Sequence, residues 1–184
     1  VAPMVAIKQI GTNGGGWYGP NSSVPLENPT PLSNLVETVS ILLLPVALVI
    51  MAGYFTGRRR LAVSVLSMML VMSAALSGLA IWAENEPNPA FAGLAADGPN
   101  LEGKELRFGA TATALWGSLT TQTSNGSVNG MHDSFNPLGG LPTLLGMFIN
   151  ATFGGAGVGL INFLLFLLVA VFLGSLMVGR APEL

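Results

Sequence analysis

The chain has 184 residues, of which 51% are hydrophobic and only 9% are charged, with a formal net charge of −2 and a mean hydropathy of +0.62. Soluble domains carry about 25% charged residues, so this composition excludes an ordinary water-soluble globule and favours a bilayer or burial in a larger assembly. The sequence has no cysteine, which excludes disulfides and thiolate metal sites.

The first motif is the glycine-rich stretch "GTNGGG" at Gly11–Gly16, which follows the short apolar segment "MVAIKQI". It matches neither a Walker A loop nor a dinucleotide fingerprint, so we expect no nucleotide to be bound by this chain. The chain opens without an initiator methionine or a signal-peptide pattern. Because the motif comes so early, we expect a piece of a longer protein.

Two uncharged apolar runs follow, over residues 38–57 and 61–83. Each is long enough to cross a hydrocarbon core as a helix. Thr30 and Pro31 supply an N-cap and a first helical position for the first run. The triplet Arg58–Arg60 between the runs predicts a cytoplasmic turn, because positive charge is retained on that side.

Residues 84–107 then form an external loop with an excess of acidic side chains. We expect its charged residues to form solvated or inter-loop pairs that stabilise little. These residues are Glu102, Lys104, Glu105 and Arg107.

The third run, residues 108–131, is rich in threonine and serine. The run is long enough to cross the membrane. If it does, and if the last run crosses once, Arg180 would lie outside. A segment that dips into the membrane and returns puts Arg180 on the same side as Arg58–Arg60, so we favour a re-entrant segment. Trp116 is expected to pack this short helix against its neighbours.

The last run is interrupted by the glycine-rich segment "FGGAGVGL". Each glycine costs about 1 kcal/mol in a helix interior, so we predict a broken helix over residues 138–179. Irregular backbone at membrane depth is tolerated where protein encloses it or where it lines a wet cavity. The glycines that we expect to form this loop are Gly154, Gly155, Gly157 and Gly159.

The stretches "TNGGG" and "SNGSV" share a hydroxyl residue, an asparagine and a glycine in the same order. Each follows a segment of short-helix character and precedes an apolar span, so the sequence indicates two copies of one unit. A short helix, a carbonyl-bearing strand and an outgoing helix are the parts of a potassium selectivity filter. The two stretches would thus each supply backbone carbonyls to one ion filter.

The segments "GTNGGG", "NSSVPLENPTPLSN", "NLEGKELRFG", "VNGMHDSFNPLGG" and "GRAPE" resemble, in order and spacing, the potassium-binding A subunits of bacterial Kdp potassium-transporting ATPases. The resemblance covers essentially the whole chain. It implies an all-α integral membrane protein of pore-like repeats, four in the complete subunit. Residues 1–57 would end the second unit, and residues 58–184 would form the third, with its incoming helix at 61–83.

The resemblance also implies site residues, function and partners. The filter residues, whose backbone carbonyls would bind K⁺, would be Thr12, Asn13, Gly14, Gly15, Ser124, Asn125, Gly126 and Ser127. The glycine-interrupted last helix, with Gly154, Gly155, Gly157 and Gly159, would form a gate loop below the filter. K⁺ would be the transported ion of a multi-pass protein of the bacterial inner membrane. ATP hydrolysis would occur in a separate P-type ATPase catalytic subunit, with small accessory subunits completing the complex, so we expect no catalytic site in this chain and no nucleic-acid partner. Asn125 and Ser127 depart from the smaller or less polar residues often found in the family.

Two other interpretations remain open on the sequence. A passive potassium channel or symporter subunit of the same superfamily would contain the same units, and a membrane scaffold would lack an ion path. His132–Asp133 resembles part of a catalytic pair, but no nucleophile pattern accompanies it. We expect a polar cluster at the outer mouth, where Asp133 would attract cations.

Overall fold

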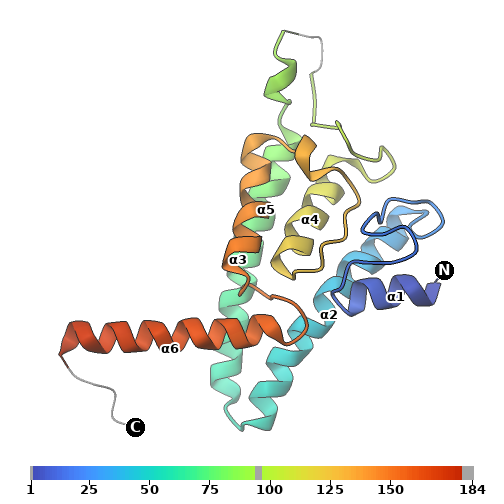
Figure 1. Ribbon diagram of the computed structural model, residues 1–184. Coiled ribbons are helices and arrows are strands. Elements are labelled where there is room, and N and C mark those ends of the chain that lie inside the picture. The colour runs from blue at the N-terminus through green and yellow to red at the C-terminus, as the bar shows by residue number, and fades with distance from the viewer. Residues whose placement is uncertain (1, 94–96, 180–184) are drawn as a thin grey trace.

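The computed structural model describes residues 2–93 and 97–179, and within these ranges the regular structure is helical (Figure 1). This confirms the all-α expectation. The helices are α1 (Ala2–Ile10), α2 (Pro31–Phe55), α3 (Arg59–Asn85), α4 (Gly109–Gln122), α5 (Pro137–Ile149) and α6 (Val158–Val178), with short 3₁₀ turns at Pro89–Phe91 and His132–Ser134.

Three of the helical segments are long and apolar enough to cross a membrane. They are α2, the segment that begins with α3, and α6, with hydropathies of 2.4, 2.0 and 2.6. The predicted runs at 38–57 and 61–83 thus lie largely within α2 and α3, which also extend through polar residues at their ends. The chain is therefore an all-helical protein suited to a membrane.

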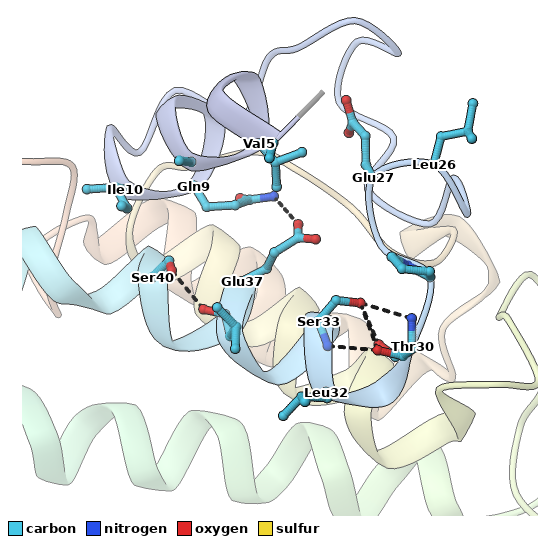
Figure 2. Close-up of a pocket in the computed structure, with 14 residues that line it drawn as sticks. Val5, Gln9, Ile10, Leu26, Glu27, Thr30, Leu32, Ser33, Glu37 and Ser40 are labelled. Carbon is cyan, nitrogen blue, oxygen red and sulfur yellow. Dashed lines mark hydrogen bonds between the residues drawn. The ribbon is translucent and has the colours of Figure 1, made fainter.

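The start of α2 agrees with the sequence-based expectation. Thr30 has extended backbone, its Oγ1 accepts a hydrogen bond from the Ser33 amide, and the Ser33 Oγ accepts one from the Thr30 amide (Figure 2). This reciprocal capping box satisfies two donors that the helix itself cannot satisfy. Pro31 occupies the first turn, where its missing N–H costs nothing.

Helix α3 is the centre of the packing. It packs against α2, α4 and α5, while α4 also packs against α5 and α1 packs against α2 (Figure 1). A hydrophobic cluster of Val49, Val65, Met69 and Phe153 joins α2, α3 and the segment after α5. This cluster holds α2 against α3 and places the segment that follows α5 against both helices.

The last helix is broken, as the glycine pattern predicted. Helix α5 ends at Ile149, and α6 begins at Val158 and lies crosswise to α5 instead of continuing it (Figure 1). Residues 150–157 form the irregular link, which we call the α5–α6 break. A Cβ at Gly159 would lie 1.6 Å from the Phe153 carbonyl oxygen, so only glycine lets the chain fold back on itself here.

One expectation for the loop before α4 was wrong. Lys104 is not in a solvated pair: its Nζ lies 2.7 Å from Glu84 Oε2, and both side chains are fully buried. The Arg107–Glu105 pair is partly exposed, as expected. The sequence did not reveal the pairing of Lys104, because Glu84 is at the end of α3, a distant segment of the chain.

Candidate functional site

The backbones after α1 and α4 follow the same course. We call Thr12–Gly15 the first loop and Ser124–Ser127 the second loop. The amides of Gly11, Thr12 and Gly14 bind the carbonyls of Ile7, Gln9 and Lys8. The three equivalent bonds recur at the second loop, from Thr123, Ser124 and Gly126 to Leu119, Thr121 and Thr120. The short sequence match therefore reflects a structural repeat.

Both loops place their first and third residues in the left-handed region. The φ angles are 48° at Thr12, 66° at Gly14, 53° at Ser124 and 78° at Gly126. Glycine accepts such angles at little cost, but a β-branched threonine rarely does. Residue type alone suggests left-handed backbone at Gly14 and Gly126, but not at Thr12 and Ser124. Strain repeated at equivalent positions is typical of functional sites.

Most carbonyl oxygens of the two loops lack an internal donor. Within residues 2–93 and 97–179, no hydrogen bond reaches the carbonyls of the first loop, or those of Ser124, Asn125 and Gly126. The Ser127 carbonyl differs, because it accepts a hydrogen bond of 2.9 Å from the Trp116 indole. Three of these residues, Asn13, Gly15 and Gly126, are exposed, so the unpaired carbonyls of the loops are available to an ion or to water.

The asparagines of the two loops act alike. Asn13 Oδ1 accepts the Gly15 amide at 3.1 Å, and Asn125 Oδ1 accepts the Ser127 amide at 3.0 Å. Each bond closes a turn between the asparagine side chain and the backbone amide two residues further on. This shared role explains why both copies contain asparagine at the second position.

The hydroxyl groups of the two loops bind the α5–α6 break. Thr12 Oγ1 accepts the Ala156 amide at 3.0 Å, and Ser124 Oγ donates to Asn150 Oδ1 at 2.5 Å. The Gly154 amide donates to the Gln122 carbonyl at the end of α4. The segment that contains Gly154, Gly155, Gly157 and Gly159 thus lies directly against the bases of both loops.

The loops also touch each other at Gly14. A Cβ added there would lie 1.9 Å from the Asn125 carbonyl oxygen and 2.7 Å from the Ser127 nitrogen. In addition, Asn125 Nδ2 donates to the carbonyls of Lys8 and Gln9 at the end of α1. The predicted site residues from the two units are therefore brought together into one cluster.

The outer residues His132 and Asp133 lie in the 3₁₀ turn that follows the second loop. The His132 ring packs against Phe135, with centroids 5.2 Å apart. Burial lowers the pKa of His132, so its imidazole is neutral near pH 7. In the part of the chain that the structure describes, no group of three His, Asp or Glu side chains could hold a metal ion.

The fold and these loops define a class: an all-helical membrane protein built on two units of a short helix followed by a loop with free carbonyls. The family model for the potassium-transporting ATPase A subunit matches residues 1–184. The chain belongs to this family, which confirms the resemblance drawn from its motifs.

Several curated relatives carry the name potassium-transporting ATPase potassium-binding subunit. The protein from Bacteroides fragilis is 53% identical over 99% of this chain and 32% of its own length. The one from Pseudomonas aeruginosa is 52% identical over 99% of this chain and 33% of its own length. The protein from Solidesulfovibrio magneticus is 51% identical over 100% of this chain and 32% of its own length. The chain thus spans about a third of the length of these relatives.

Proposed function

We propose that this chain is the central part of the ion-binding subunit of an ATP-driven potassium importer. Its two loops would form part of a filter in which backbone carbonyls bind K⁺ on its way across the cytoplasmic membrane. The observation that carries the proposal is the matched pair of loops, with left-handed residues at equivalent positions and carbonyl oxygens free of internal donors.

The physical basis is the exchange of water for carbonyl oxygen. A potassium ion that enters a narrow pore loses hydration, and rings of carbonyl dipoles replace the lost water. Helices α1 and α4 both end at the loops, so the partial negative charge of each helix C-terminus points toward the same region. Both features favour a cation without placing a carboxylate in its path.

We infer that α4 and the second loop are re-entrant. Helix α4 has 14 residues and rises about 21 Å, which is too short for a hydrocarbon core of about 30 Å. Residues 1–57 and 58–184 would then belong to successive pore-like units. The α5–α6 break would act as a gate beneath the filter, since it contacts both loops.

The family name and those of the relatives support assembly with other subunits of a potassium-transporting ATPase. In this proposal a P-type ATPase subunit hydrolyses ATP and small accessory subunits complete the complex. This chain supplies ion binding and contributes no catalytic residue.

The experiment compares two substitutions in the complete complex. Gly126 has φ +78° and no atom within 4 Å of an added Cβ, and Gly109 at the start of α4 has φ +76° and equally open surroundings. Gly126→Asp introduces a side chain at the free carbonyls, whereas Gly109→Asp imposes the same backbone strain outside the loops. We expect Gly126→Asp to raise the apparent KM for K⁺ at least tenfold, corresponding to about 1.4 kcal/mol.

The readout is K⁺-dependent ATPase activity of the purified complex, with Gly109→Asp as the matched control. An aspartate at Gly109 lies at a helix N-terminus, where negative charge is favourable, so this variant should keep the wild-type KM. An unchanged KM in Gly126→Asp would refute the filter assignment.

A further inference from the structure

A chain of buried polar side chains connects α2, α1 and the second loop. Gln9, in the last turn of α1, is only 1% exposed. Its Nε2 donates to Glu37 Oε2 at 2.9 Å and to Ser22 Oγ at 3.0 Å, and Figure 2 shows the first of these bonds crossing from α1 to α2. Its Oε1 accepts the Ser127 hydroxyl at 3.0 Å. Both ends of the Gln9 amide are therefore occupied.

Glu37 decides which way the Gln9 amide faces. The Glu37 Oε2 accepts a hydrogen bond from the Gln9 Nε2, and this contact selects the NH₂ end of the amide. The reversed amide would place Oε1 beside the Glu37 oxygens, whereas the Ser127 hydroxyl can donate or accept. In the observed orientation, the Gln9 Oε1 accepts the Ser127 hydroxyl.

Ser127 is held at all of its polar groups. Its amide binds Asn125 Oδ1, its hydroxyl binds Gln9, and its carbonyl binds Trp116. Asn125 is in turn bound to the α1 carbonyls of Lys8 and Gln9. Through these bonds, Asn125 and Ser127 attach the second loop to α1.

We propose that Glu37 and Gln9 are positioning residues that set the spacing between the two loops, and through it the ion preference of the filter. This inference rests on the proposed function. The loops are in contact at Gly14, so a shift of Ser127 moves the carbonyls of Asn125 and Gly126 relative to the first loop. The placement of carbonyl oxygens determines how well ions of different radius are bound.

The test uses the complete complex and measures the ratio of apparent KM values for Rb⁺ and K⁺ in ATPase assays. Glu37→Leu removes the acceptor, and we expect the ratio to change by about two- to tenfold, the range for loss of one hydrogen bond, with kcat unchanged. Glu37→Gln keeps an acceptor oxygen for Gln9 Nε2 and should restore the wild-type ratio. A purely structural role for Glu37 would lower yield or stability without moving the ratio.

Ser127→Ala tests the other end of this series of hydrogen-bonded side chains with little loss of volume. If the Glu37→Leu complex does not assemble, Ser127→Ala alone decides whether the positioning role is right. It should shift the ratio in the same direction as Glu37→Leu. The double variant should be no worse than the stronger single variant, because both remove one connected network. Ser40→Ala is the control, because Ser40 lines the same pocket between α1 and α2 as Gln9 and Glu37. In the part of the chain that the structure describes, its hydroxyl bonds only within α2, to the Val36 carbonyl.

A wild-type ratio in Ser127→Ala, or strictly additive effects in the double variant, would overturn the inference. Gly126→Asp separates this result from failure of the filter itself. If Gly126→Asp raises the KM for K⁺ and Ser127→Ala leaves the ratio unchanged, the filter stands and the positioning role is wrong. If Gly126→Asp has no effect, the proposed function fails first.

Discussion

At the scale of single residues, neighbouring glycines in the first loop have different physical roles. At Gly14, φ is +66° and an added Cβ would collide with the second loop. At Gly15, φ is not positive and no atom lies within 4 Å of an added Cβ. In Gly14→Ala, left-handed strain of about 1–2 kcal/mol adds to overpacking of about 1–3 kcal/mol. We therefore expect Gly14→Ala to destabilise the complete subunit by about 2–5 kcal/mol.

The matched substitution is Gly15→Ala, which should change stability by about 0.5 kcal/mol or less. Denaturant unfolding of the detergent-solubilised subunit, followed by tryptophan fluorescence, measures both. Equal stability of the two alanine variants would show that the contact between the loops at Gly14 is not a stabilising constraint.

The short repeat and the family resemblance predicted the eight loop positions, but not how each is used. The sequence is compatible with left-handed backbone at its glycines, because glycine carries no Cβ penalty. It could not indicate the same conformation at Thr12 and Ser124, whose hydroxyls bond to Ala156 and Asn150 across the molecule. The Trp116 bond to Ser127 was likewise hidden, because an apolar helix position suggests packing and says nothing of the indole N–H.

At the scale of elements, a buried polar cluster joins the end of α3, the loop before α4 and the start of α5. Glu84 binds Lys104 through Oε2, and its two carboxylate oxygens also accept hydrogen bonds from Asn100 and the Asn136 amide. Glu84 is 0% exposed, so removing Lys104 would leave a buried carboxylate without a counter-charge. That loss typically costs about 3–5 kcal/mol.

We predict that Lys104→Met destabilises the complete subunit by about 3–5 kcal/mol. The control is Glu105→Gln, because the Glu105–Arg107 pair is partly exposed and such pairs contribute about 0–1 kcal/mol. Denaturant unfolding midpoints in detergent compare the two variants. A loss no greater than that of Glu105→Gln would mean that water or another cation compensates Glu84.

Local sequence signals located the elements better than the contacts between them. Thr30 and Pro31 predicted the start of α2, and the glycines predicted the break before α6, because caps and helix breakers act within one turn. The sequence predicted a broken helix over residues 138–179 but not the end of its first piece, and α5 spans Pro137–Ile149. Asn150 adopts a left-handed conformation with φ 42° and ends the helix before the glycines, which glycine content alone could not indicate.

At the scale of the whole molecule, charge is separated along the α2–α3 hairpin. Arg58 lies in the turn between these helices and Arg59 and Arg60 begin α3, whereas residues 97–108 lie toward the other end and the two loops lie between (Figure 1). From the positive-inside rule we predict that the turn lies in the cytoplasm and that residues 97–108 and the entrance to the loops face the outside. Helix α6, of which only Gly159 is buried, would be covered by lipid or by the remainder of the subunit.

Single cysteines test this orientation directly, because the 184 residues contain none. Thr56, at the end of α2, and Ala92, in the loop after α3, are both exposed. In an otherwise cysteine-free complete subunit, Ala92→Cys should react with a membrane-impermeant maleimide in intact cells. Thr56→Cys should react only after the inner membrane is permeabilised, because about 30 Å of hydrocarbon separates the two sides. Labelling of Thr56→Cys in intact cells would reverse the topology and place the proposed filter entrance on the cytoplasmic side.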